Sequence, residues 1–333
     1  MDDEFHDLLN ADDTDELIIY IVNKYIAYKP TVSGEVQWST EREGTPGKLT
    51  FTVVKDGVID FQEGNTVKLF YKKQPVFWGY VFEKNRDKGS TIKVTAYDQL
   101  RYLKNKDTFK LENSTVSQFV KMIVEDFGLK CGEIDDTEYV IAQNLMDNKT
   151  LFDMIQENLD TTLINTKKLY ILYDNFGRIN LKNLDNMYTL GLVDESKLEN
   201  FDYTSSIDGE TYNFIKILYT NDTTGEREAY KAKDTENMKN WGMLQYFDTA
   251  DSPEGLKERA ETLLKLYDKK TRKLSLKNVI GDVRVRAGCG LKVKLGLGDI
   301  SIDNKFVCES VTHTFKEGKH LMDITLWGND IFG

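Results

Sequence analysis

The feature that most constrains this chain of 333 residues is a β pattern that occurs twice. In the first copy, alternating apolar residues around Leu49 precede "EGNTVKL" and "VFWGYV", then Gly89 and "IKVTA". In the second, alternation around Leu274 precedes "AGCGLKV" and "KFVCESV", then Gly318 and "MDITL". Alternation with a period of two is typical of half-buried strands. The shared order and spacing indicate duplication of one structural unit, with a chance match of β patterns as the alternative.

Between the two β regions the periodicity becomes helical. A helix is expected after Ser114 or Thr115, either of which can act as N-cap, and another after Thr150. A β-hairpin should follow and turn at Asp174–Gly177, "DNFG". This stretch therefore predicts a compact α+β insertion.

These observations predict a mainly β fold in which two similar small β-barrels flank a helical α+β domain. The expected parts are listed by residue range: an acidic N-terminal tail at 1–16, a first β-barrel at 17–107, an α+β insertion domain at 108–200, and a second β-barrel with one helix at 201–333.

The charge balance excludes some partners. The formal net charge is −11, whereas binding along nucleic acid needs a basic face, so no sequence-specific nucleic acid partner is expected. Three scattered cysteines fit a reducing compartment better than a disulfide framework. No basic segment precedes an apolar one at the N-terminus, and Leu17–Val22 is far shorter than the ~20 residues of a spanning helix, so neither secretion nor membrane insertion is expected.

The first 16 residues carry eight carboxylates and no Lys or Arg. One interpretation is a solvated, frayed tail. The other is a docking arm, because Phe5, Leu8 and Leu9 provide a small apolar face.

Two of the three histidines lie in "FVCESVTHTFKEGKHLMDITLWG", with Cys308 and Asp323 nearby. A turn at Glu317-Gly318 places His313 and His320 on the apolar face of a hairpin, with Cys308 and Asp323 on the opposite face. A tetrahedral zinc site needs three or four ligands, and the third histidine, His6, lies in the acidic tail. We therefore expect core histidines and no metal, cofactor or catalytic residues.

Other chemistry finds little support in the sequence. No zinc-protease, nucleophile-elbow or phosphate-loop motif occurs, and "GLG" at 296–298 is followed by a strand-like segment rather than a helix. Trp78 and Tyr80 could stack sugars, but alternation with Phe77 favours packing or subunit contact. Among the 55 acidic residues, no pair can be singled out as glycosidase carboxylates.

Taken together, several segments resemble the XkdQ-like family of baseplate hub proteins from contractile tails of prophages and phage-tail-like bacteriocins. The quoted segments are "VQWSTEREGTPGKLTFTV", "EGNTVKLFYKKQPVFWGYV", "VTAYDQLRYLKNKDTF", "STVSQFVKMIVEDFGL", "KTLFDMIQENLDTTL", "GDVRVRAGCGLKVKL" and "CESVTHTFKEGKHLMDITL". The resemblance covers almost the whole chain after about residue 15.

The resemblance implies a structural role. Three chains with two barrels each would form a homotrimer with a pseudo-sixfold ring, joining the tail tube protein to the trimeric spike protein. Other baseplate proteins, and a tape measure protein, are further implied partners. The implied location is the phage tail particle, assembled in the cytoplasm of the host cell. An acidic lumen that lets DNA pass is a hypothesis motivated by the net charge, and tight DNA binding at physiological salt would contradict it.

Two other functions stay open at this point. A tail-associated peptidoglycan hydrolase would clear cell-wall substrate in a zymogram, and the clearing would disappear when one acid is replaced. A carbohydrate-binding module would lose glycan binding in Trp78→Ala.

Overall fold

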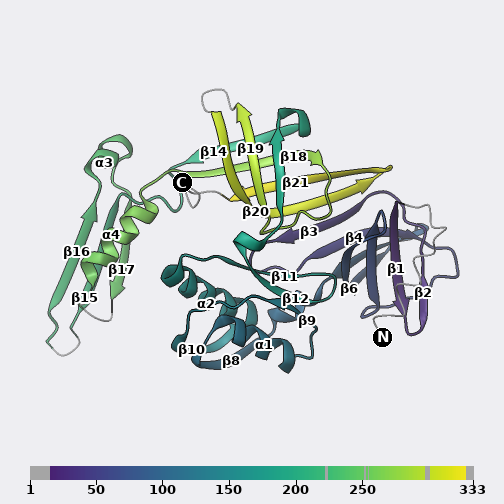
Figure 1. The fold of residues 1–333 in the computed structure, drawn as a ribbon, viewed down its shortest axis with the longest axis horizontal. Coiled ribbons are helices and arrows are strands. Elements are labelled where there is room, and N and C mark those ends of the chain that lie inside the picture. Colours follow the sequence, from purple (N-terminus) through teal and green to yellow (C-terminus); the bar gives the residue numbers. More distant parts are fainter. Residues whose placement is uncertain (1–15, 222–223, 251–252, 254, 297–300, 328–333) are drawn as a thin grey trace. The chain divides into compact units, whose positions relative to one another are not determined.

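The computed structural model describes residues 16–221, 224–250, 253, 255–296 and 301–327 (Figure 1). The secondary structure of these residues is mainly β, which confirms the expected fold class. They form two compact units. The first contains residues up to Phe201 together with Ser275–Trp327, and the second contains Asp202–Leu274.

Some sequence predictions fall on other parts of the chain. The expected acidic tail, except Glu16, lies outside the described residues, and so do His6, Phe5, Leu8 and Leu9. The same is true of most of the "GLG" segment, of which only Gly296 is described.

The first copy of the repeated pattern folds into seven strands that pair antiparallel with one another. They are β1 (Leu17–Asn23), β2 (Ile26–Tyr28), β3 (Val36–Glu41), β4 (Lys48–Val54), β5 (Thr66–Tyr71), β6 (Gln74–Arg86) and β7 (Thr91–Tyr97). Their order in the sheet is β3-β4-β7-β6-β5-β1-β2.

The second copy folds into six strands. They are β13 (Thr189–Asp194), β14 (Asn200–Ser206), β18 (Thr271–Ile280), β19 (Gly290–Gly296), β20 (Ser301–Lys316) and β21 (Lys319–Trp327). Their order is β14-β18-β21-β20-β19-β13, which matches β3-β4-β7-β6-β5-β1 strand for strand. One difference is that β13 pairs parallel with β19, whereas β1 pairs antiparallel with β5.

The sequence led us to expect two small β-barrels, but the two copies do not close into separate barrels. Strand β20 is 16 residues long, and its first half pairs with β19 while its second half pairs with β3. The described strands of both copies therefore belong to one 13-stranded sheet, and their pairings close no ring.

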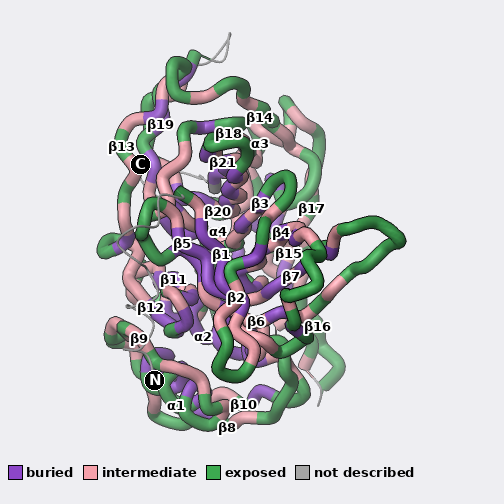
Figure 2. The backbone as a smooth tube through the Cα atoms, turned by 90° about the vertical axis from the view of Figure 1, so that its right-hand side faces the viewer, coloured by how far each residue is buried: buried purple, intermediate pink, exposed green. Residues whose placement is uncertain are grey.

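The core of the first copy explains why this segment folds as a sheet. Leu49, Phe51 and Val53 of β4 are at most 1% exposed, while Thr50 and Thr52 between them are half-buried. Burying each such apolar side chain stabilises the fold by about 1.5–3 kcal/mol. Figure 2 shows that the buried residues are concentrated in the strands and that the turns between them are exposed.

The α+β insertion connects the two copies. Its elements are η2 (Gln99–Lys104), β8 (Lys106–Ser114), α1 (Val116–Asp126), β9 (Cys131–Ile134), β10 (Ile141–Thr150), α2 (Leu151–Thr166), β11 (Tyr170–Asp174), β12 (Ile179–Asn183) and η3 (Leu184–Asn186). Of the two candidate caps, Thr115 caps α1 in a capping box with Gln118, and Thr150 caps α2. Strands β11 and β12 form the hairpin predicted around the "DNFG" turn.

The second unit is a small three-stranded sheet. Its elements are β15 (Phe214–Thr220), β16 (Arg227–Lys233), α3 (Thr235–Trp241), β17 (Gln245–Ala250) and α4 (Leu256–Tyr267). Strand β15 lies between β16 and β17, and α4 packs through Leu256 and Ala260 on Ile215 and Ile217. A further short helix, η4 (Glu195–Lys197), precedes β14 in the first unit. The four residue ranges expected from the sequence stay a prediction, since a compact unit is not by itself an evolutionary domain.

Candidate functional site

The junction between the two copies is built on β20 and β3. Their register runs antiparallel from Ser310 opposite Glu41 to Phe315 opposite Val36. A β-bulge between Cys308 and Ser310 leaves Glu309 as the extra residue. The Glu309 carbonyl accepts the Arg42 backbone N–H at 2.9 Å, and its carboxylate accepts Arg42 Nε at 2.8 Å. The bulge thus begins the contact between the copies.

Two buried histidines lie beside this junction. His313 Nε2 is 2.9 Å from the Val285 carbonyl oxygen, and His313 Nδ1 is 2.8 Å from His320 Nε2. A carbonyl only accepts hydrogen bonds, so a neutral His313 carries its proton on Nε2. Its bare Nδ1 must then accept from His320 Nε2–H. His320 Nδ1 is consequently an unprotonated nitrogen, and it has no hydrogen-bond partner within the described structure.

This arrangement favours neutral rings. Burial, together with repulsion from His320, lowers the pKa of His313 to about 3. Burial also lowers the pKa of His320 to about 4, against the attraction of Asp282. The rings stack in a column, with His313 and Trp38 centroids 4.6 Å apart and His320 and Phe315 centroids 4.2 Å apart.

The geometry matches the predicted hairpin except at one residue. His313 pairs with Met322 and His320 with Phe315, as the register required, and Asp323 is turned to the solvent side, where it pairs with Lys277. Cys308, however, is fully buried, whereas the sequence pattern placed it on the polar face. The bulge at the next residue shifts the alternation by one, and no residue pattern in the sequence predicts it. No cluster of three or more metal-binding side chains occurs among the described residues.

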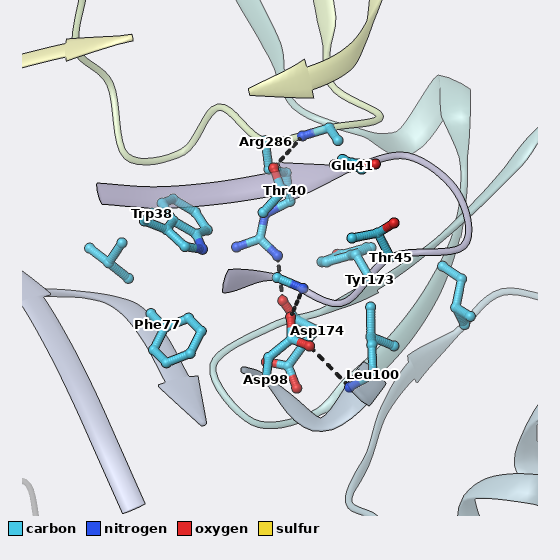
Figure 3. Close-up of a pocket in the computed structure, with 14 residues that line it drawn as sticks. Trp38, Thr40, Glu41, Thr45, Phe77, Asp98, Leu100, Tyr173, Asp174 and Arg286 are labelled. Carbon is cyan, nitrogen blue, oxygen red and sulfur yellow. Dashed lines mark hydrogen bonds between the residues drawn. The ribbon is translucent and has the colours of Figure 1, made fainter. Parts of the chain in front are cut away.

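A second polar cluster, of two buried carboxylates and a half-buried arginine, was missed by the sequence analysis. Asp98, at the start of η2, Asp174, at the end of β11, and Arg286, in the loop before β19, converge beneath β3 (Figure 3). Asp98 accepts the N–H groups of Gly47 at 2.9 Å and Leu100 at 3.0 Å. No periodicity distinguishes these three residues from surface charges, so nothing in the sequence marked them.

The cluster holds the insertion against both copies of the repeat. Arg286 Nη1 donates to the Asp174 backbone carbonyl at 2.5 Å, and its guanidinium lies 4.8 Å from the Tyr173 ring centroid and 5.6 Å from that of Trp38. The Asp174 carboxylate accepts the Gly177 N–H at 2.6 Å. Arg286 therefore links β11 of the insertion to β3 of the first copy.

Burial also sets the charge state of this cluster. It raises the pKa of Asp174 to about 7, although the Gly177 hydrogen bond and Arg286 act in the opposite direction. Burial raises the pKa of Asp98 well above its usual range, and the nearby Asp174 adds to this effect. The associated cavity is only about 20 Å³, which is room for a single water molecule and too small for a sugar or a nucleotide. Raised carboxyl pKa values are common at active sites, but this geometry admits no substrate of that size.

The aromatic pair considered for sugar stacking is engaged within the protein. The Trp78 and Tyr80 centroids are 5.0 Å apart in an edge-to-face arrangement, and Lys130 Nζ lies 5.3 Å from the Trp78 ring centroid. A Cβ atom at Gly177 would lie 2.6 Å from the Trp78 ring, so the "DNFG" turn packs directly on it. Trp78 thus anchors the insertion to β6.

The chain is similar to several known proteins. A profile of the YqbQ-like family matches residues 36–327. The phage-like element PBSX protein XkdQ of Bacillus subtilis is 27% identical over 320 residues, which cover 92% of this chain and 96% of that protein. Among the described residues, no helix is long and apolar enough to cross a membrane.

Two solved structures share the fold. The 43 kDa tail protein of prophage MuSo2 from Shewanella oneidensis has a TM-score of 0.70 at 12% identity, covering 96% of this chain and 100% of that chain. The c3393 protein of E. coli, a component of the type VI secretion system with structural similarity to the T4 tail proteins gp27 and gp5, has a TM-score of 0.55 at 10% identity. That match covers 93% of this chain and 76% of the other.

Proposed function

Because this chain belongs to the YqbQ-like family, as its sequence resemblance led us to expect, we propose that it is the structural hub of a baseplate in a contractile phage tail or a phage-tail-like bacteriocin. The broader role, a structural component of a phage tail, is supported by the similarity to XkdQ and to the MuSo2 tail protein. These relatives are structural proteins rather than enzymes.

The observation that carries the finer proposal is the strand order, which is the same in both copies of the repeat. A ring closes only when one contact, repeated around an axis, returns to its start. Three chains with two similar copies each present six similar units in such a ring. In such an assembly a threefold axis relates the three chains, and an approximate sixfold axis relates their six copies of the repeat.

This proposed symmetry is the basis for the proposed partners. A pseudo-sixfold face suits a hexameric tail tube, and a threefold face suits a trimeric spike, with other baseplate proteins around the ring. The similarity of c3393 to the T4 tail proteins gp27 and gp5 supports a place in a tail or a tail-like assembly. The proposed location of the protein is the tail particle, assembled in the cytoplasm of the host.

Light scattering of the purified protein tests the oligomer. A homotrimer of this 38.4 kDa chain has a mass of about 115 kDa. A species that stays at the mass of one or two chains, with or without the spike protein, would contradict the proposal. A zymogram with peptidoglycan should show no clearing. Clearing by the purified chain would support the alternative hypothesis of a peptidoglycan hydrolase.

A further inference from the structure

The two copies of the repeat agree in register down to a single bulge. Strands β6 and β7 shift register between Val81 and Glu83, and β20 and β21 shift between Cys308 and Ser310. Phe82 in the first copy therefore corresponds to Glu309 in the second. Since bulges re-aim a strand and end a pairing, a shared bulge indicates that the following residues have the same task.

The hydrogen bonds around the bulge confirm this alignment. Gly64 N–H donates to the Val81 carbonyl at 2.8 Å, and Gly288 N–H donates to the Cys308 carbonyl at 2.8 Å. Val81 and Cys308 each donate in turn, at 2.9 Å, to the residue after that glycine. Both glycines have a left-handed backbone, with φ of +86° and +87°. The residues Glu83–Arg86 of β6 thus correspond to Ser310–His313 of β20.

The two corresponding segments differ in what covers them. Beyond its bulge, β20 pairs with β3. Strand β6 pairs with β5 only as far as Tyr80, and from Glu83 onward its other described partner is β7 alone. One edge of Glu83–Arg86 is therefore left without a strand partner in the described part of the chain. An uncovered edge of this kind is a template for pairing with another chain.

A strand that would fit this edge exists in the second copy. Strand β14 corresponds to β3, and it is the last strand in the sheet order, so its outer edge has no described strand partner. On its inner side β14 pairs with β18, and the Glu199 N–H donates to the Lys277 carbonyl at the beginning of this pairing. Among the described residues, Glu83–Arg86 thus presents one uncovered edge and β14 presents another.

From this correspondence we infer that Glu83–Arg86 of one chain pairs antiparallel with β14 of a second copy of this chain, in the register that β20 uses with β3. This inference rests on the proposed trimer and specifies its interface. Three such contacts between chains, alternating with the β20–β3 contact within each chain, form the ring.

The side chains allow the register to be stated. Phe201 and Tyr203 of β14 are half-buried and alternate with exposed residues, whereas Val36 and Trp38 of β3 are buried and alternate with half-buried residues. We assign Tyr203 to the place of Trp38, so that Arg86 lies opposite Tyr203, as His313 lies opposite Trp38. An exposed Arg above a tyrosine ring is a favourable cation–π pair. Asn85 then lies opposite Thr204, as Thr312 lies opposite Ser39.

Cysteine cross-linking tests this register. In a Cys131→Ser background, which removes the exposed native thiol, the double variant N85C/T204C should give disulfide-linked dimers and trimers on non-reducing gels after mild oxidation. The matched control T312C/S39C, at the corresponding positions within one chain, should form an intrachain disulfide and no linked oligomer. Either single variant, and N85C/D202C two residues out of register, should give none.

The outcomes separate this inference from the proposed function. If light scattering shows a trimer and T312C/S39C oxidises, but N85C/T204C forms no interchain bond, the β6–β14 contact is wrong and the hub assignment stands. If the protein remains monomeric and N85C/T204C fails to cross-link, both are overturned. Disulfide-linked trimers that form with N85C/T204C, and with none of the control variants, support both the β6–β14 contact and the hub assignment.

Discussion

The histidine pair beside the β20–β3 junction should make the first unit sensitive to acid. The folded protein keeps His313 neutral to a pKa of about 3, whereas an unfolded histidine has a pKa of about 6.5. Below pH 6.5 the unfolded state therefore binds more protons than the folded state, and stability falls as the pH falls. Between pH 7 and pH 5, His313 alone should lower the free energy of unfolding by about 2 kcal/mol, with a nearly equal loss from His320.

The double variant H313F/H320F isolates this effect. Phenylalanine retains the ring stacking on Trp38 and Phe315 but removes both titrating groups. It leaves the Val285 carbonyl without its donor, which costs about 1–3 kcal/mol at every pH. The variant should therefore be less stable than the wild type at pH 7. Its free energy of unfolding should fall less between pH 7 and pH 5 than that of the wild type, and the difference between the two falls should be at least about 2 kcal/mol.

Urea unfolding followed by tryptophan fluorescence at pH 7 and pH 5 measures both quantities, since Trp38 stacks on His313. A T314V variant, on the same strand but without a titrating group, should retain the wild-type pH difference. If H313F/H320F and the wild type lose equal stability between the two pH values, the reasoning about the buried pair is refuted.

Three further predictions concern the first unit. Gly281→Ala should destabilise it by about 1–3 kcal/mol in urea unfolding, because the new Cβ would lie 2.2 Å from the His320 ring; an unchanged midpoint would contradict the packing. Between pH 4 and pH 7 the folded wild type keeps a proton on Asp174 that the unfolded chain has lost, so the wild type should lose about 1.4 kcal/mol of stability per pH unit as the pH rises. Asp174→Asn lacks this proton and should gain stability relative to the wild type by that amount. Parallel pH curves for the two proteins would disprove a carboxyl pKa near 7. Phe51→Ala should cost about 3–5 kcal/mol by the same assay, and a loss below 1 kcal/mol would show that this core is loosely packed.

Local patterns were sufficient to predict much of the fold. The period-two alternation around Leu49 and in the 306–328 hairpin predicted the faces that are buried, because a strand with one apolar face has only one register that buries it. Thr115 and Thr150 were recognisable as caps because their hydroxyl groups accept otherwise unpaired N–H groups of the first turn. The similarity of the two copies was likewise visible in the sequence.

Features that depend on distant parts of the chain were not predictable. The bulge at Glu309 is fixed by Arg42, 267 residues away, so alternation alone misplaced Cys308. The joining of β20 to β3, which replaces two closed barrels by one sheet, is also a long-range pairing. The Asp98–Asp174–Arg286 cluster draws one residue from each of three separate segments, and each residue alone looks like an ordinary surface charge.

The most direct test of the account is an electron microscopy average of the purified protein, alone or on its spike, viewed along the symmetry axis. Three chains carrying the same strand order twice should give a ring of six similar β-lobes with threefold symmetry. A ring with any other number of lobes, or three pairs of plainly unlike lobes, would contradict it.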